Sequence, residues 1–171
     1  DSSTSRGLGD VYKRQPNGGI MAEQTISRID KENFLLMGAI GSEVKDYQWL
    51  EWHSDDYDVV IENLTESWGG LLLTGPNARK ILSQCTQEDL SNNAFSWLSC
   101  KTIKIDSASV FAMRVSYAGE LGWELHMPTW QLISIYESLM EMGEEFGLKD
   151  FGGLALNLSL IHISEPTRRR G

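Results

Sequence analysis

The chain has 171 residues, 41% hydrophobic and 23% charged, and its formal net charge is -9. This length suits about one domain, and the acidic balance disfavours nucleic acid as a partner, because phosphate backbones are bound by Lys and Arg. No apolar run approaches the ~20 residues of a transmembrane helix, so no membrane partner is predicted.

The first part of the chain is predicted to form a hairpin followed by a helix. Residues 20–29 and 34–39 have the composition of strands and flank a polar turn at 30–33. Ser42 is placed to cap the N-terminus of a helix that reaches about His53.

The middle of the chain is predicted to combine strands with a short helix. Pro76 is suited to the first turn of a helix that ends near Gln84, because its ring fixes φ at a helical value. Arg79 on this helix is expected to face solvent or to pair with an acid of the same helix. The strands predicted in this region cover residues 59–61, 70–74, 101–105 and 110–117.

A longer helix is predicted from Thr129 to Phe146, and Gly147 is suited to the left-handed position that follows a helix. Its apolar stripe is expected to comprise Ile133, Tyr136, Leu139, Met140 and Phe146. Strand pairs interspersed with helices are typical of the α+β class, here with mixed or antiparallel sheets and packed helices.

The cysteines and most of the tryptophans are predicted to need no ligand. Cys85 and Cys100 are too few for a zinc site, so no metal is expected, and both are interpreted as reduced thiols in the core or near the surface, with a disulfide as the less favoured alternative. The tryptophans interpreted as packing residues are Trp49, Trp52, Trp68, Trp97 and Trp130.

The segment 114–128, RVSYAGELGWELHMP, is predicted to form a strand, a tight turn and a second strand. Since successive strand side chains point to opposite faces, Glu124 and His126 are expected to share one face. Gly119 and Gly122 bracket the turn, where a missing Cβ lets a ligand approach the backbone. The spacing fits both a ligand site and a half-buried hairpin with solvated acids. The opposite face would carry Trp123, Leu125 and Met127.

Residues 116–124, SYAGELGWE, resemble the word G-Y-T-G-E-x-G-x-E of the folate-binding aminomethyltransferase family, to which the glycine cleavage T-protein belongs. The chain is most similar to the branch in which an FAD-dependent half that oxidises dimethylglycine precedes this region. The other segments that agree with the family in the same order lie at 18–28, 73–79, 88–95 and 151–157.

The resemblance implies a catalytic carboxylate at Glu23 and contacts with tetrahydrofolate at Glu23, Gln24 and Thr25. Glu23 would accept the proton released when the folate amine attacks an iminium or formaldehyde carbon, and would stabilise the cation. Gln24 replaces a Leu of the family pattern, which is tolerable if the contact uses its backbone. On residue type alone, Glu23 would be a solvent-facing strand residue.

The resemblance also implies that Glu124 anchors the pterin ring, because one carboxylate can accept two adjacent N–H groups. Tyr117, Leu125 and His126 are the further contacts expected around the cofactor. On residue type alone, Tyr117 would be an aromatic at the edge of the core, and His126 would be a surface histidine.

The implied domain is a truncated folate-binding region at 16–157. Residues 1–15 and 158–171 resemble translated sequencing-adapter sequence and are expected to be foreign to that domain. No G-x-G-x-x-G follows a predicted strand, so FAD is expected only in the absent half of the enzyme.

The implied function belongs to one-carbon metabolism. Tetrahydrofolate would capture an amine-derived one-carbon unit as 5,10-methylenetetrahydrofolate, and this piece alone is expected to be inactive. The alternatives are a sarcosine-oxidising relative, a glycine cleavage T-protein or a non-catalytic paralogue that serves as an interaction domain. The expected location is the mitochondrial matrix in a eukaryote and otherwise the cytoplasm.

Overall fold

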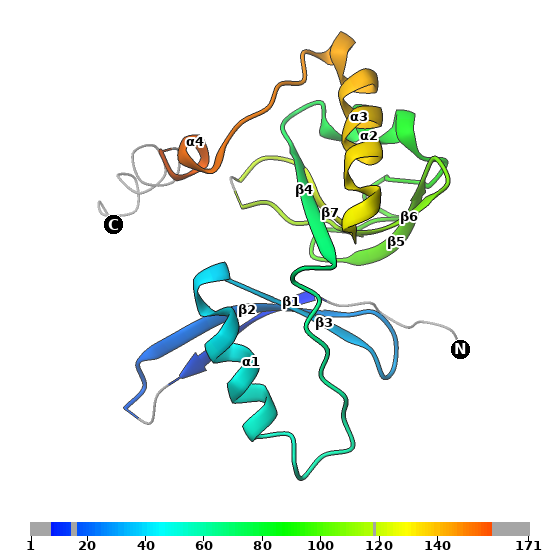
Figure 1. Cartoon of the computed structure of the whole chain (residues 1–171). Helices are drawn as coiled ribbons and strands as arrows, with labels where there is room; N and C mark the ends of the chain where they lie inside the picture. Colours follow the sequence, from blue (N-terminus) through cyan, green and yellow to red (C-terminus); the bar gives the residue numbers. More distant parts are fainter. Residues whose placement is uncertain (1–7, 15–16, 118, 159–171) are drawn as a thin grey trace.

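The computed structural model describes residues 8–14, 17–117 and 119–158. The chain forms two antiparallel sheets, each accompanied by helices, and the sheets lie one above the other in Figure 1. This arrangement confirms the α+β class. No helix within the described part of the chain is long and apolar enough to cross a bilayer.

The first sheet has the order β1-β2-β3 and comprises β1 (Leu8–Arg14), β2 (Ile20–Arg28) and β3 (Phe34–Gly38). β2 and β3 form the predicted hairpin. Asp30 organises its turn, because its Oδ1 accepts the backbone N–H groups of Glu32 and Asn33, each at 2.9 Å. These bonds, the one from Glu32 first, lower the pKa of the Asp30 carboxyl.

β1 belongs to the segment expected to be foreign and pairs antiparallel with β2 along its length. Strand pairing uses backbone groups that every sequence carries. The contact is therefore compatible with a foreign segment as well as with a native part of the domain. Most of the two ends in question, 1–7 and 159–171, lies outside the described residues, and the proposed domain limits stay a prediction.

A 3₁₀ turn, Ile40–Ser42, leads into α1 (Glu43–Trp52), which ends one residue before the predicted end. Ser42 occupies the N-cap position, but the prediction that its side chain caps the helix is wrong. Ser42 has a helical backbone, with φ of -107° and ψ of -3°, where a capping residue is usually extended. Its hydroxyl donates to Oδ2 of the buried Asp46 at 2.6 Å.

The strand predicted at 59–61 does not form. Val59 and Val60 are exposed by 56% and 96%, on an irregular segment between α1 and β4. A strand needs a partner to satisfy its backbone groups, and the segment pairs with neither sheet. Local β-propensity was therefore misleading at this position.

The second sheet has the order β4-β7-β6-β5. Its strands are β4 (Trp68–Thr74), β5 (Cys100–Ile105), β6 (Ala108–Met113) and β7 (Gly122–Pro128). The strand predicted at 110–117 ends at Met113. Beyond it, Arg114 continues the pairing on the β5 side through Leu98 and Ser99, but the N–H of Val115 donates back to the Met113 carbonyl oxygen and the pairing with β7 ends.

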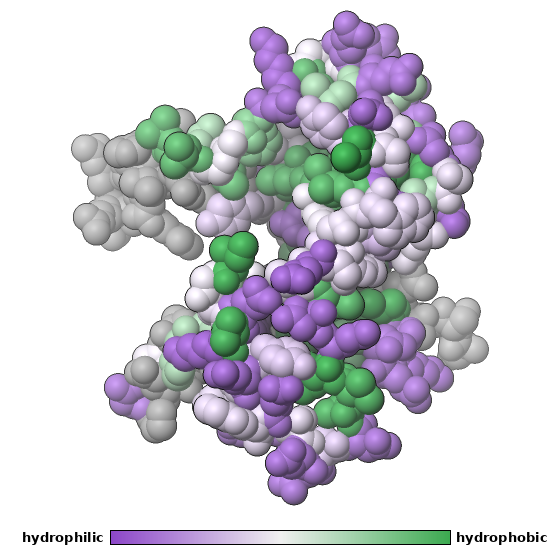
Figure 2. All heavy atoms as spheres, viewed as in Figure 1, coloured by the Kyte–Doolittle hydropathy of each residue, from purple (hydrophilic) through white to green (hydrophobic). Residues whose placement is uncertain are grey.

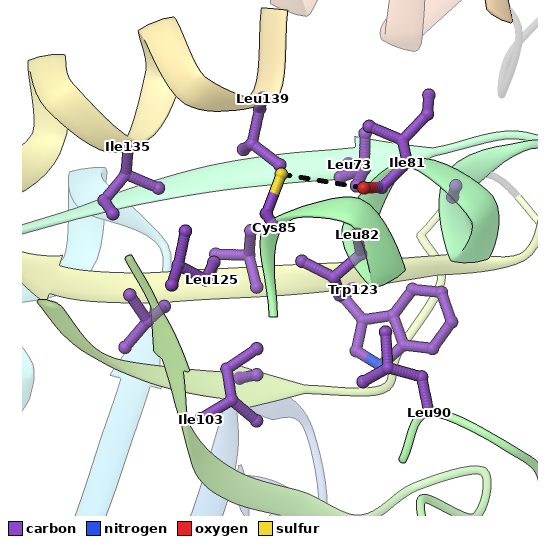
Figure 3. Packing of buried hydrophobic residues seen from close by; sticks show 14 of the residues in the cluster. Leu73, Ile81, Leu82, Cys85, Leu90, Ile103, Trp123, Leu125, Ile135 and Leu139 are labelled. Carbon is purple, nitrogen blue, oxygen red and sulfur yellow. Dashed lines mark hydrogen bonds between the residues drawn. The ribbon is translucent and has the colours of Figure 1, made fainter. Parts of the chain in front are cut away.

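Two helices pack on one face of the second sheet (Figure 3). α2 (Ala78–Cys85) begins two residues after Pro76, which lies in the preceding turn. α3 (Leu132–Gly143) has a 3₁₀ turn at each end, Thr129–Gln131 and Glu144–Phe146. Gly147 follows with φ of 71°, as predicted. A short α4 (Gly153–Leu158) ends the described chain.

The predicted apolar stripe of α3 is wrong at Ile133 and Tyr136, which are 70% and 36% exposed. The buried face instead includes Ile135 and Leu139, which are four residues apart and therefore adjacent on one side of the helix. They join the main core, which lies between the sheet and the two helices. Its buried members include Leu73, Ile81, Leu82, Ile103, Val110, Trp123 and Leu125.

Most of the tryptophans interpreted as packing residues are exposed, which corrects that interpretation. Trp52 and Trp130 have exposed fractions of 73% and 79%, and Trp49 and Trp97 are exposed as well. Trp68 packs in the second core cluster. On the face drawn in Figure 2, apolar residues gather in separate groups between hydrophilic ones.

The second core cluster joins the two sheets. Its buried members, Cys100, Phe111 and Met113, contact partly buried side chains that include Leu35 and Met37 of β3. The hydroxyl of Ser27 on β2 donates to the Met113 sulfur at 3.2 Å, and the Cys100 thiol lies 3.8 Å from the carbonyl oxygen of Arg28. The face of β2 that carries Ser27 is therefore turned toward the second sheet.

Candidate functional site

Glu23 and Thr25 lie on the side of β2 that faces the second sheet. Ser27 defines this side, because it is fully buried and its hydroxyl contacts Met113. Positions 23, 25 and 27 share one face, since side chains alternate along a strand. Glu23 is exposed and Thr25 is half-buried, so the carboxylate stands beyond the packed junction of the sheets.

Gln24 lies on the opposite face of β2. A Cβ added to Gly38 would be 3.6 Å from both Gln24 Cγ and Asp46 Oδ2, which places the Gln24 side chain near the start of α1. Gln24 can therefore contact a ligand beside Glu23 only through its backbone. A backbone contact does not depend on the side chain, so Gln in place of the Leu of the family pattern is tolerable here.

β7 shows the predicted alternation. Glu124 and His126 are half-buried, while the side chains on the other face, Trp123, Leu125 and Met127, are fully buried in the core. Leu125 therefore directs its side chain away from Glu124. Any contact that Leu125 makes with a ligand at Glu124 would have to come from its main chain.

Glu124 and His126 form a pair on one face of β7. His126 Nε2 lies 3.3 Å from Glu124 Oε2, and the side chains are 19% and 32% exposed respectively. Oε1 of Glu124 has no hydrogen-bond partner in the part of the chain described here. Gly70 lies opposite His126 on β4, where a Cβ would be 3.0 Å from the imidazole Nδ1. Gly70 thus leaves room for the ring.

Glu23 and Glu124 lie on facing surfaces of the two sheets. Met113 on β6 contacts Ser27 and is paired directly with Glu124 on β7. The Cβ atoms of Met113 and Glu124 are therefore about 5 Å apart. Glu23 is four residues from Ser27 along β2, a rise of about 13 Å. The two carboxylates thus share the inter-sheet side. Their convergence on one ligand stays a prediction.

The connection before β7 is longer than the predicted tight turn, because β6 ends at Met113 and β7 starts at Gly122. Tyr117 lies in it with 60% of its surface exposed, and Gly119 has a φ of +77°. Gly122 is not a turn residue but a close-approach position, since a Cβ there would be 2.9 Å from the Leu73 carbonyl oxygen.

Glu23, Glu124 and His126 are residue types that suit proton transfer and hydrogen bonding. Two carboxylates accept protons or N–H groups, and the imidazole of His126 is close enough to exchange a proton with Glu124. Within the described ranges there is no group of three or more His, Cys, Asp or Glu side chains that could hold a metal ion.

Sequence reasoning missed the environment of Arg79. Arg79 is half-buried and pairs with no acid among the described residues. Its Nη2 donates to Asn92 Oδ1 at 2.7 Å, and its guanidinium carbon lies 5.8 Å from the centre of the Trp123 ring. The signal that could have suggested this contact is the alternation that buries Trp123. Both cysteines are reduced and buried, in different core clusters.

The comparison with known families gives one match over nearly the whole described chain. The model of the GCVT N-terminal domain matches residues 12–160. Among solved structures, a heterotetrameric sarcosine oxidase from Corynebacterium sp. U-96 is similar with a TM-score of 0.68 and 16% identity, over 88% of this chain and 70% of that one. At this identity the likeness shows the fold.

Curated relatives agree with the family match. The chain is 41% identical over 144 residues to human mitochondrial dimethylglycine dehydrogenase, which covers 83% of this chain and 17% of that protein. Its identity to the mouse enzyme is 43% with the same coverage. An aminomethyltransferase of Alkaliphilus metalliredigens is 34% identical over 80% of this chain and 37% of its own length. The chain thus spans a minor part of each relative.

Proposed function

Because the chain belongs to the GCVT N-terminal domain family, we propose that it is the tetrahydrofolate-binding part of a dimethylglycine dehydrogenase. This region holds the folate while a one-carbon unit from oxidative N-demethylation is captured as 5,10-methylenetetrahydrofolate. The observation that supports this branch is identity, which is 41% to the human dehydrogenase and 34% to an aminomethyltransferase over similar lengths. FAD belongs to a part of the enzyme outside this chain.

The open oxygen of Glu124 fits a pterin ring. Tetrahydrofolate supplies the amine nitrogen that receives the one-carbon unit. Glu124 Oε1 has no hydrogen-bond partner in the described chain and can accept an N–H group, while Oε2 remains beside His126. Tyr117, exposed in the connection before β7, adds an aromatic surface and a hydroxyl. These residues bind and orient the ring.

Glu23 supplies the acid–base function in this proposal. Its carboxylate is exposed on the inter-sheet side of β2, where it can accept the proton that the folate amine loses on bond formation. The negative charge of Glu23 also stabilises positive charge on the one-carbon unit before capture. Glu23 acts on the reacting atoms, whereas Glu124 holds the ring.

Replacing Glu124 tests the binding role. We expect Glu124→Ala to weaken binding of tetrahydrofolate by about 1.5–3 kcal/mol, the range for hydrogen bonds to a charged group. Anaerobic calorimetric titration of this chain and of the full-length parent measures the effect. Glu120→Ala is the matched control, since Glu120 is an exposed acid of the preceding connection. Equal affinity of Glu124→Ala and wild type would remove Glu124 from the site.

A second candidate is an aminomethyltransferase of the glycine cleavage type, favoured by the 34% identity noted above. It shares the folate but takes its one-carbon unit from a different donor. A flavin absorbance spectrum of the purified parent decides between them, because only the dehydrogenase carries FAD. A parent that binds no tetrahydrofolate would instead support a non-catalytic paralogue.

The names of the same relatives support a proposal for the location in the cell. The mammalian dehydrogenases are named as mitochondrial proteins, which supports a mitochondrial location if the source is a eukaryote. A bacterial source would place the protein in the cytoplasm.

A further inference from the structure

Two arginines lie beside the indole ring of Trp123, on the face of β7 opposite Glu124, and each of the three side chains has a buried N–H donor without a partner among the described residues. Trp123 is fully buried, and the guanidinium carbons of Arg79 and Arg114 each lie 5.8 Å from its ring centre. The Nε atoms of both arginines and Nε1 of Trp123 are buried and make no hydrogen bond in the described structure. Buried polar groups are nearly always hydrogen-bonded, so this cluster lacks an acceptor.

The two arginines also lack a negative charge. Arg79 donates to the amide oxygen of Asn92, and Arg114 donates to the carbonyl oxygen of Phe95 at 2.6 Å. Both acceptors are neutral, and neither arginine forms an ion pair with any described residue. Arg114 is only 8% exposed. Its burial, and then the charge of Arg79, lower the pKa of Arg114.

We propose that Arg79 and Arg114 form a binding site for a small oxyanion, a carboxylate or a phosphate group, beside Trp123. An oxyanion supplies both missing features, several acceptor lone pairs and a negative charge, and the planar guanidinium matches its geometry. The ring of Trp123 and the adjacent Phe95, 6.2 Å away, form an apolar support.

The site is built by separate elements that meet in the core. Arg79 lies in the first turn of α2, and Arg114 follows the last residue of β6. Trp123 belongs to β7, and its side chain is on the face opposite Glu124. The oxyanion site is therefore distinct from the proposed folate site, and it does not depend on the proposed function.

The matched control within the chain is Arg28. Its guanidinium also lies 5.8 Å from an aromatic ring, that of Phe34. Its Nε, however, already donates to the Asp30 carbonyl oxygen at 2.9 Å, and Arg28 is exposed. Arg28 therefore reproduces the cation–π contact of the site without its unpaired donor.

Titration of the full chain with sodium phosphate and with sodium acetate, at constant ionic strength held with chloride, tests the proposal. We expect the side-chain Nε–H resonances of Arg79 and Arg114 to shift and saturate in ¹⁵N spectra, while that of Arg28 stays in place. Saturation with phosphate alone identifies a phosphate site, and saturation with acetate identifies a carboxylate site. Shifts no larger than that of Arg28 with either anion would overturn the proposal.

Arg79→Gln provides the second measurement, because Arg79 is less buried than Arg114 and its replacement disturbs the core less. We expect this change to weaken oxyanion binding about 10- to 100-fold, as the loss of a charged hydrogen-bonding partner does. Arg28→Gln should bind like the wild type. Unchanged binding by Arg79→Gln would also overturn the proposal.

Discussion

At the scale of single residues, the acid–base assignment depends on Glu23. In the full-length parent, we expect Glu23→Gln to keep folate affinity close to that of the wild type, because the amide preserves the shape of the side chain. Formation of methylenetetrahydrofolate should slow by about 100-fold or more, the usual contribution of a general base. Calorimetry measures the affinity, and rapid-mixing kinetics measures the rate.

Glu32→Gln is a suitable control for this experiment, since Glu32 is an exposed acid in the turn that follows β2. A Glu23→Gln enzyme that forms product at the wild-type rate would show that the proton leaves by another route.

Cys85 gives the pH dependence of stability. Burial first, and then the charge of Asp106, raise the pKa of its thiol from 9.0 to about 11. Between these values the unfolded chain has lost the proton that the folded chain keeps, so the free energy of unfolding falls as pH rises. We expect a loss of about 2 kcal/mol over pH 9 to 11, absent in Cys85→Ala, in urea titrations at successive pH values.

The sequence predicted some of the side-chain environments of the candidate site. The alternation along β7 placed Glu124 with His126 and buried Trp123, because the period of a strand is fixed by its backbone geometry. The same alternation could not predict that Arg79 lies beside Trp123. That contact joins α2 to β7, which are far apart in the sequence, and a local pattern carries no information about it.

At the scale of elements, Gly122 controls how closely β4 and β7 approach. A Cβ at this position would lie 2.9 Å from the backbone oxygen of Leu73, and backbone cannot move aside as a flexible side chain does. We expect Gly122→Ala to lower the free energy of unfolding by about 1–3 kcal/mol, measured by urea denaturation. Gly41→Ala, where no heavy atom lies within 4 Å of the added Cβ, should be close to neutral.

The elements that could be predicted are those with strong local signals. The β2–β3 hairpin has its polar turn, and α3 has the glycine that ends it. The errors arose where tertiary contacts decide the outcome. The pairing of β6 with β7 stops at Met113 and Glu124, and the segment around Val60 has no strand beside it.

At the scale of the whole molecule, the two sheets differ in how much core supports them. All buried members of the main cluster lie between Leu73 and Leu139, whereas among residues 17–19 and 21–72 only Ser27 and Asp46 are buried. We expect the free energy of opening, which limits exchange of backbone amides with solvent, to be lower for β2 and β3 than for β6 and β7. Native-state hydrogen exchange measures both, and equal protection would contradict this division.

The overall arrangement could be predicted as a class but not as a topology. The sequence indicated strand pairs with helices, and the sheets are indeed antiparallel. The order β4-β7-β6-β5 places β7 next to β4, a pairing that depends on contacts far apart in the chain. The relation of Glu23 to Glu124 follows from that packing, and the family resemblance alone suggested that both serve one ligand.

Two contacts across the junction of the sheets involve sulfur, with Met113 beside Ser27 and Cys100 beside Arg28. Packing shields both atoms, since Met113 and Cys100 are 1% and 2% exposed. Peroxide therefore reaches them only when the sheets part, and conversion of Met113 to its sulfoxide would install a polar group that resists repacking. The extent of Met113 oxidation therefore reports how often the two sheets have separated.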